Sequence, residues 1–160
     1  MTAQILDRTL TSFRIGDPNG TYPIFGATGS TIAPGRWNTP GSPLIYTSQH
    51  FSTALLEKLV RGSGRLPPNQ HYIQITLPKG LSYEAFSPPA LPDWDSFPAF
   101  VSKAFGEQWV KERRSAILIV PSVVARLDKN VLINPSHPEF STIEASLHKP
   151  VFWDRRLFGA

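Results

Sequence analysis

Five consecutive apolar residues at positions 116–120 constrain the fold of this chain more than any other segment. Three of the five are β-branched, and Pro121 and Ser122 end the run. A short apolar run of this kind, bounded by a breaker, is typical of a strand in the interior of a sheet. We therefore expect a central strand here, with other strands on both sides.

The rest of the chain supplies the partners. Further strands are predicted at 9–15, 44–47, 71–77, 131–133 and 151–153, and helices at 50–61 and 99–114. Ser48 is expected to cap the first helix, and the glycines at 62 and 64 to end it. The segments 16–43 and 86–98 are rich in Pro and Gly and are expected to be loops. We predict one α+β domain over residues 1–160, with a core of roughly 10–158 and a central mixed sheet flanked by helices.

Composition excludes several classes of site. The chain has 160 residues and no cysteine, so disulfides, thiolate metal sites and a cysteine nucleophile are impossible. Its four histidines lack metal-binding spacing, and we expect no metal. The net charge of +4 is modest. Neither a signal peptide nor an apolar run of about 20 residues is visible, so we expect a cytoplasmic protein without a membrane partner.

Three side chains on successive elements are the main candidates for a site. Arg36 lies in a Pro/Gly-rich loop, Tyr46 in the predicted strand 44–47, and Glu57 in an otherwise apolar stretch of the first helix. A guanidinium matches phosphate oxygens, an aromatic ring packs on a flat heterocycle, and a carboxylate binds ribose. Together they suit a nicotinamide dinucleotide. Ser122, at the end of the predicted central strand, is a fourth candidate.

Each candidate also has a structural interpretation. Arg36 could stack on Trp37, Tyr46 could belong to the core, and Glu57 could form a surface pair with Arg61. A serine at a strand end is often a turn or capping residue. The pattern alone leaves these alternatives open.

Several motifs resemble one family. They are Phe13-Arg14, Gly35-Arg36-Trp37-Asn38, Ile45-Tyr46-Thr47-Ser48, Ala54-Leu55-Leu56-Glu57, Val120-Pro121-Ser122, Asn134-Pro135-Ser136-His137-Pro138 and Phe152-Trp153-Asp154-Arg155-Arg156-Leu157-Phe158. They resemble the RES-domain toxins of toxin–antitoxin pairs, whose antitoxin is of the Xre helix-turn-helix type. The likeness extends over roughly residues 10–158.

The resemblance implies a fold similar to ADP-ribosyltransferase toxins and an enzyme that consumes NAD⁺ as a substrate, with no cofactor. Members split the nicotinamide–ribose bond and pass ADP-ribose to water, phosphate or a protein. By motif, the catalytic residues would be Arg36, Tyr46, Glu57 and Ser122, and the NAD⁺-binding residues Arg14, Arg36, Tyr46 and Asn134. An Xre-type antitoxin would occlude the pocket, and no direct binding of nucleic acid is expected.

Two departures from the family pattern stand out. Arg61 takes the place of a histidine that commonly follows the Leu-Leu-Glu run, and the loop 17–34 is long. Two other functions remain as alternatives. One is a nucleic-acid-binding or RNA-cleaving toxin that uses the positive charge and exposed aromatic residues. The other is a silent protein-interaction module that uses the Pro-rich segment 86–98.

Overall fold

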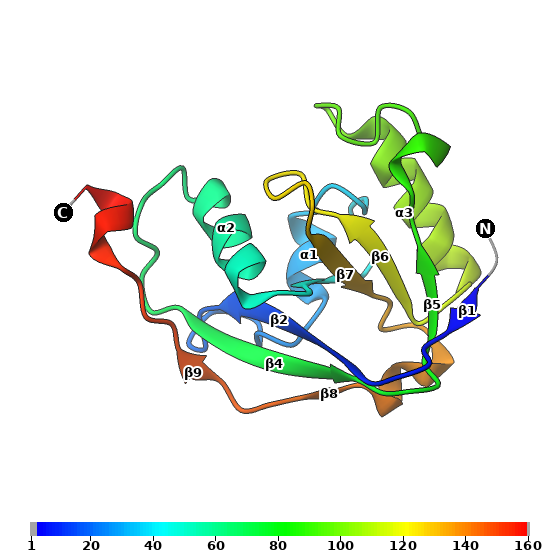
Figure 1. Cartoon of the computed structure of the whole chain (residues 1–160), viewed down its shortest axis with the longest axis horizontal. Coiled ribbons are helices and arrows are strands. Elements are labelled where there is room, and N and C mark those ends of the chain that lie inside the picture. The colour runs from blue at the N-terminus through cyan, green and yellow to red at the C-terminus, as the bar shows by residue number, and fades with distance from the viewer. Residues whose placement is uncertain (1–2, 160) are drawn as a thin grey trace.

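The computed structural model describes residues 3–159, and within them nine strands form a single sheet. The strand order is β1-β5-β6-β7-β3-β2-β4-β8, and β9 also pairs with β4 (Figure 1). Only the β5–β6 pair is parallel among the described strands. The sheet is therefore mixed and the chain folds as one α+β unit, which confirms the predicted fold class.

The longest connections between the elements lie on either side of α1, between β2 and β3. The strands are β1 Gln4–Ile5, β2 Leu10–Gly16, β3 Ile45–Ser48, β4 His71–Leu77, β5 Ser82–Ala85, β6 Ile117–Pro121, β7 Lys129–Ile133, β8 Glu144–Ala145 and β9 Lys149–Pro150. The helices are α1 Thr28–Ile32, α2 Phe51–Arg61 and α3 Phe100–Glu112, with 3₁₀ turns η1 Pro88–Ala90, η2 Pro138–Thr142 and η3 Arg155–Phe158. No helix in the described part of the chain is long and apolar enough to cross a membrane.

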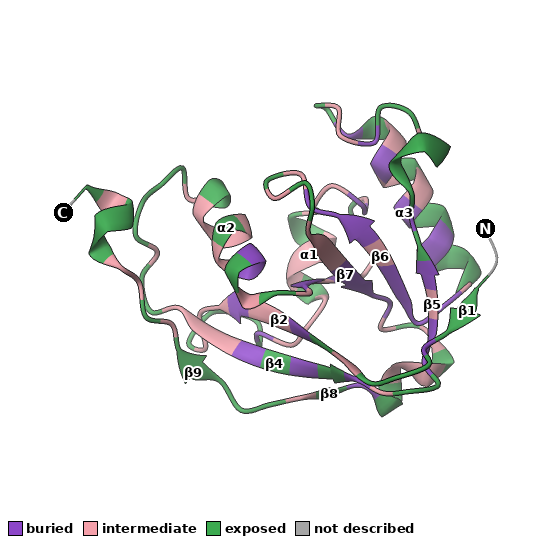
Figure 2. Ribbon diagram, in the orientation of Figure 1, coloured by how far each residue is buried: buried purple, intermediate pink, exposed green. Residues whose placement is uncertain are grey.

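The apolar run at 116–120 becomes β6, which lies between β5 and β7 as a central strand. Successive side chains of a strand point to opposite faces, so β6 contributes to two cores. Ile117 packs in one cluster, and Leu118 and Val120 pack in another that also contains Trp109 of α3. Figure 2 shows the buried residues concentrated along β6 and β7. The sheet thus has apolar packing on both sides at its centre.

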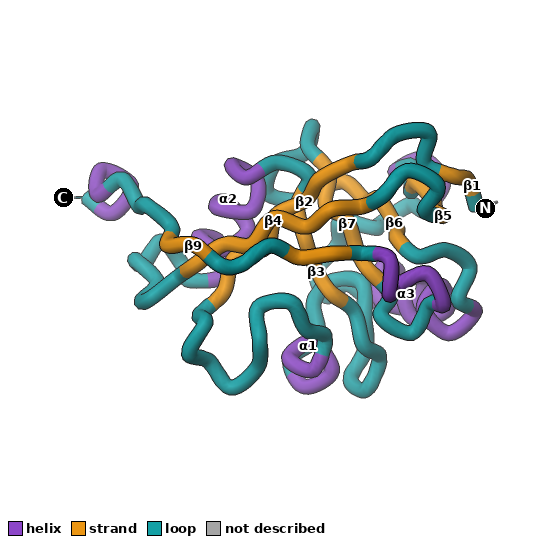
Figure 3. The backbone as a smooth tube through the Cα atoms, turned by 90° about the horizontal axis from the view of Figure 1, so that it is seen from below, coloured by secondary structure: helices purple, strands orange, loops and turns teal. Residues whose placement is uncertain are grey.

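The two long helices lie over different parts of the sheet. The helix α2 contacts β2 and β3. In Figure 1, α3 lies beside β5 and β6 instead, and Figure 3 also shows the two helices well apart. Gly106 allows α3 to approach the loop before β3 closely, because a Cβ there would lie 1.7 Å from the carbonyl oxygen of Trp37. Only glycine fits at this contact, which holds the loop of residues 34–38 against α3.

Two local predictions are wrong. Ser48 does not cap α2, because its hydroxyl donates instead to Asn130 on the neighbouring strand. Residues 151–153 form no strand, and the pairing with β4 occurs just before them, in β9. The short strands β1 and β5 were not predicted. In each case the outcome depends on a partner that is distant in sequence.

Candidate active site

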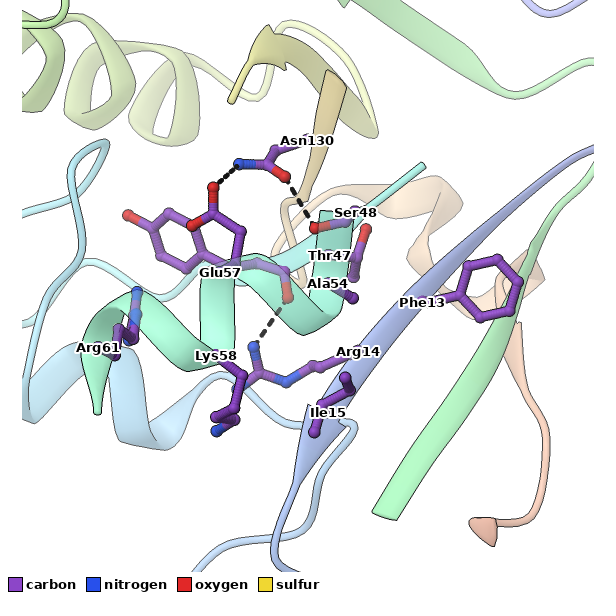
Figure 4. A pocket seen from close by; sticks show the side chains of 11 residues that line it. Phe13, Arg14, Ile15, Thr47, Ser48, Ala54, Glu57, Lys58, Arg61 and Asn130 are labelled. Carbon is purple, nitrogen blue, oxygen red and sulfur yellow. Dashed lines mark hydrogen bonds between the residues drawn. The ribbon is translucent and has the colours of Figure 1, made fainter. Parts of the chain in front are cut away.

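A pocket opens where β2 and β3 diverge. These strands pair through one register position, Phe13 with Ser48, and α2 covers the gap beyond it. The pocket has about 550 Å³ of empty volume, including its open mouth. Its lining comes from β2, β3, α2 and the start of β7 (Figure 4): Phe13, Arg14, Ile15, Tyr46, Thr47, Ser48, Ala54, Glu57, Lys58, Arg61 and Asn130.

Glu57 is the only carboxylate in this lining. It is half-buried, and Oε1 accepts hydrogen bonds from Ser122 Oγ at 2.7 Å and from Asn130 Nδ2 at 3.1 Å. Within residues 3–159 it forms no ion pair, so the surface pair with Arg61 is absent. Both bonds end on one oxygen, which leaves Oε2 as the atom able to meet a ligand.

Ser122 reaches the site only through Glu57. Its side chain is fully buried just after β6 and does not line the pocket. Besides donating to Glu57, its hydroxyl accepts a hydrogen bond from the backbone N–H of Ala125 at 3.1 Å. A hydroxyl held from both sides in this way orients the carboxylate.

Three cations line the same pocket as the carboxylate. Arg14 comes from β2, and Lys58 and Arg61 come from the same helix as Glu57 (Figure 4). Positions three and four apart share one helix face, which explains why Glu57 and Arg61 meet the same pocket. Among the described ion pairs, none involves these three side chains. The pocket therefore carries an excess of positive charge.

Burial and mutual repulsion lower the pKa values of two of these cations. Burial, followed by repulsion from Arg61, lowers the pKa of Arg14 to about 10. Burial, then Arg14 and Arg61, likewise lowers the pKa of Lys58. Among the described ion pairs, no carboxylate offsets the burial of Arg14 and Lys58 or their repulsion by other cations. An anion bound in the pocket would do so.

Arg14 is anchored on one side only. Its Nε donates to the carbonyl of Ile24 at 2.6 Å and its Nη1 to the carbonyl of Tyr46 at 2.8 Å. No hydrogen bond in the described part of the chain uses Nη2. The guanidinium is thus oriented by backbone oxygens while one nitrogen stays available to a ligand.

Tyr46 contributes to the pocket wall and is clamped from behind. Its hydroxyl donates to Asn38 Oδ1 at 2.6 Å and accepts from the N–H of Trp37 at 3.0 Å. A Cβ at Gly35 would lie 2.6 Å from Tyr46 Cζ, so only glycine fits against the ring. Burial raises the pKa of Tyr46, and the phenol stays protonated. The Gly35–Asn38 motif therefore fixes this ring in place.

Arg36, the cation that the sequence placed at the site, does not line the pocket. Its Nη1 donates to the carbonyl oxygens of Ser96 at 2.7 Å and Trp94 at 3.2 Å. These bonds tie the loop behind Tyr46 to the Pro-rich segment. The structure brings Arg14, Tyr46 and Glu57 together at one pocket and leaves Arg36 outside it.

Asn134, which was predicted to bind NAD⁺, does not line this pocket. Its side chain is fully buried, Nδ2 donates to the carbonyl of Val110 at 3.1 Å, and Oδ1 accepts from the N–H of Ser136 at 2.9 Å. Both polar atoms of the amide are therefore used within the fold. It joins the end of β7 to α3.

Sequence reasoning missed Lys58 and Asn130 as pocket residues and treated Arg61 as a departure from the family pattern. A helical wheel centred on Glu57 would have placed Arg61 beside it, and Lys58 lies three positions before Arg61. Asn130 gave no such signal, because its position depends on the pairing of β7 with β3. Among residues 3–159, no cluster of three or more potential metal ligands occurs.

Comparisons with known proteins identify the family of this chain. A family model described as the RES domain matches residues 11–154. The "Prs ADP-ribosylating toxin" of a Sphingobium species is 36% identical over 156 residues, covering 93% of this chain and 97% of that protein. "Toxin Res" of Yersinia enterocolitica is 33% identical over 128 residues, covering 77% of this chain and 83% of that protein.

A solved structure shares the fold. The crystal structure of the M. tuberculosis MbcT–MbcA toxin–antitoxin complex matches with a TM-score of 0.68 at 14% identity, covering 92% of this chain and 86% of the matched one. The family match spans most of the sequence, and the Sphingobium relative aligns over almost its whole length. The chain therefore belongs to the RES domain family.

Proposed function

We propose that this RES-domain toxin consumes NAD⁺ by breaking the bond between nicotinamide and ribose. One observation carries the proposal: a carboxylate without an ion-pair partner, held at one oxygen, lies in a pocket whose other charged groups are all cations. A ligand that combines two phosphates with a sugar that becomes positive during reaction matches both features. The name of the Sphingobium relative, an ADP-ribosylating toxin, supports the same substrate.

The pyrophosphate of NAD⁺ would bind to Arg14, Lys58 and Arg61. A guanidinium offers forked donors to phosphate oxygens, and an ammonium adds a compact charge. These cations repel one another in the free protein, as the lowered pKa values of Arg14 and Lys58 show. Binding a dianion would replace that repulsion by attraction, so part of the affinity would come from relief of existing strain.

Glu57 would act on the reacting sugar. When the C1′–N bond breaks, both electrons leave with the nicotinamide nitrogen, and the ribose becomes an oxocarbenium-like cation. Oε2 of Glu57 would stabilise that charge as it develops, which lowers the barrier more than contacts with the ground state do. Nicotinamide departs as a neutral molecule, so its departure needs no general acid. One carboxylate suffices where glycosidases usually need two.

The other predicted residues act as supports in this proposal. Tyr46 would offer its ring to the nicotinamide or ribose, since its hydroxyl is engaged with Asn38 and Trp37. Ser122 would orient Glu57. Arg36 would hold the loop that clamps Tyr46, through the carbonyls of the 94–96 segment.

We further propose that a protein accepts the ADP-ribose, as the name of the Sphingobium relative indicates for that toxin. An antitoxin of the Xre helix-turn-helix type would neutralise the activity by covering the pocket. This part is supported by the structural neighbour, which was solved as a toxin–antitoxin complex. Water and phosphate remain the competing acceptors to be measured.

The decisive experiment incubates purified protein with NAD⁺ alone, with phosphate, and with cell lysate, and follows nicotinamide and ADP-ribose by mass spectrometry. We expect nicotinamide release by the wild type and its loss in Glu57→Gln, with ADP-ribose attached to a lysate protein. Glu144→Gln, an exposed carboxylate on β8, is the matched control and should behave as wild type. Unchanged NAD⁺ in the wild-type reaction, or equal turnover by Glu57→Gln, would refute the proposal.

A further inference from the structure

We propose that Asn130 is a positioning residue for the catalytic carboxylate. Together with Ser122 it fixes Oε1 of Glu57, so that Oε2 is the oxygen presented to the ribose. This inference rests on the proposed role of Glu57 in NAD⁺ cleavage. It assigns a function to a residue that no motif of the sequence indicated.

The backbone of Asn130 is held on both sides. It lies in β7, opposite Ser48 of β3 on one edge and Val120 of β6 on the other. A residue in an interior strand has less freedom than one in a loop, and a side chain built on it is placed more precisely. The amide nitrogen that reaches Glu57 therefore starts from a rigid support.

The orientation of the amide is fixed as well. Ser48 Oγ donates to Asn130 Oδ1 at 2.8 Å, and the Ser48 side chain is buried. This bond selects the rotamer in which Nδ2 faces Glu57, since the flipped amide would place an oxygen against the carboxylate. Ser48, Asn130 and Glu57 form a chain in which each donor is directed at the next acceptor (Figure 4).

Two hydrogen-bond donors on one oxygen fix the orientation of the Glu57 carboxylate more tightly than a single donor does. Ser122 approaches Oε1 from the segment after β6, and Asn130 approaches it from β7. Hydrogen bonds to an ionised group are the strong ones, and two from different segments restrict rotation about the last side-chain bond of Glu57. A stabilising charge acts fully only when it is aimed at the reacting atom, so a rotated carboxylate would lose rate.

Asn130 also lines the pocket, and a direct contact with substrate is the competing role. The two roles differ in kinetics. A positioning residue alters the transition state more than the bound ground state, so kcat falls while KM stays nearly constant. A group that only binds substrate raises KM and leaves kcat unchanged.

The test compares Asn130→Ala and Asn130→Asp in steady-state NAD⁺ consumption. Aspartate keeps the shape but replaces the donor by an acceptor, so it should be at least as harmful as alanine. We expect kcat to fall by roughly 10- to 100-fold in both, as for small misplacements of catalytic groups, with KM within about twofold. Asn19→Asp, the same change at an exposed turn residue, is the control and should leave both constants unchanged. Retained kcat in Asn130→Asp, or an effect confined to KM, would overturn the proposal.

A double-mutant cycle tests whether the two donors share one task. Ser122→Ala and Asn130→Ala each free the same oxygen, so their effects on kcat should be coupled, and the double variant should lose less than the product of the single losses. Fully independent losses would contradict a joint role. Circular dichroism and thermal unfolding of each variant establish that the fold is retained.

A readout without substrate separates this inference from the proposed function. The carboxyl carbon of Glu57, observed by ¹³C NMR, reports its hydrogen bonds in the free protein. We expect its signal to move in Asn130→Ala and Asn130→Asp and to stay in place in Asn19→Asp. An unmoved signal refutes the positioning role even in an active enzyme. A moved signal in a protein that leaves NAD⁺ intact refutes the proposed reaction alone.

Discussion

The two flanks of the sheet differ in how their charged side chains are paired. On the α3 flank, several charged groups form ion pairs. The buried carboxylate of Glu84 accepts from Arg114 at 3.3 Å, and Arg126 pairs with Asp95 at 2.6 Å. Nη1 of Arg36 donates to two backbone carbonyls. This flank also holds the aromatic cluster around Trp109, and its polar contacts serve packing.

On the α2 flank, cations gather without carboxylate partners. Arg14, Lys58 and Arg61 face a pocket whose single carboxylate is engaged by uncharged donors. The lowered pKa values of Arg14 and Lys58 record the cost. Unpaired like charges gathered in one pocket are typical of a binding site. Changes on the α3 flank should therefore reduce stability, and changes on the α2 flank should alter function.

The largest loss of stability is expected from Gly106→Ala on the α3 flank. The new methyl group would lie 1.7 Å from the carbonyl oxygen of Trp37, so the helix or the loop must shift. We expect the free energy of unfolding to fall by about 3 kcal/mol, the upper range for overpacking. Urea denaturation measures it. Gly29→Ala, where the nearest atom is an ordinary 3.7 Å away, is the control. Equal stability of the two variants would contradict the close approach.

Arg114→Met is expected to have the next largest effect. It leaves the buried carboxylate of Glu84 without its cation. Removing one partner of a buried pair costs about 3–5 kcal/mol, and we expect about 2 kcal/mol here because Arg114 is partly exposed. The exposed pair of Arg126 provides the control, since Arg126→Met should cost less than about 1 kcal/mol.

A second substitution sharpens this prediction. Combining Arg114→Met with Glu84→Leu removes both charges, and thermal unfolding should then recover most of the lost stability. If the double variant is no more stable than Arg114→Met, packing and not charge explains the loss.

On the α2 flank, Lys58→Arg tests the pH dependence of the pocket. Burial and the neighbouring cations lower the pKa of Lys58, so its charge is lost at a lower pH than that of an ordinary lysine. The KM for NAD⁺ should therefore rise several-fold on the alkaline side in wild type, and less so in Lys58→Arg, because a guanidinium loses its charge at a higher pH than an ammonium in the same place. Lys111→Arg, on the exposed face of α3, is the control. Identical alkaline profiles would exclude Lys58 from binding.

The same titration has the opposite sign for stability. A base whose pKa is lowered in the folded state binds fewer protons there than in the unfolded chain. The contribution of Lys58 to the free energy of unfolding therefore rises as the pH increases through its lowered pKa in the folded protein. It becomes constant above the pKa that Lys58 has in the unfolded chain. Wild type should gain stability relative to Lys58→Arg over this window, measured by urea denaturation at several pH values. A constant difference between them would contradict the assignment.

The smallest effect is expected from Arg61→Gln. Lys58 and Arg61 are like charges three positions apart on α2, a repulsion worth about 0.2–0.5 kcal/mol. Its removal should raise the free energy of unfolding by that amount and raise the KM for NAD⁺. Arg65→Gln removes an equal charge beyond the end of the helix and should change neither. If Arg61→Gln lost stability and kept its KM, Arg61 would have a structural role, and the expected difference between the two flanks would be contradicted.

Local patterns predicted the regular elements well. The apolar run gave β6, the alternation at 71–77 gave β4 with the same bounds, and the two long helices were placed within a few residues. These features depend on neighbours in sequence, so periodicity reveals them. The strand predicted at 151–153 and the unpredicted β1 and β5 show the limit, because short strands exist only through their partners.

The candidate site divides in the same way. Residue types and motifs alone pointed to Glu57, Tyr46 and Arg14, and all three line one pocket. They also pointed to Arg36, whose donors the tertiary structure uses on carbonyls. A sequence shows that an arginine is present, but it does not show which acceptors lie within its reach.

The amino-acid sequence by itself determined the fold class, the central strand and the presence of an acid-bearing helix, because each follows from short-range patterning. Only the tertiary structure decided which cations meet that acid and which amide orients it. Asn130 reaches Glu57 because β7 pairs with β3 and places it opposite Ser48. Contacts of this kind join residues more than 70 positions apart, and strand pairing, with the packing of α2 over the gap between β2 and β3, creates them.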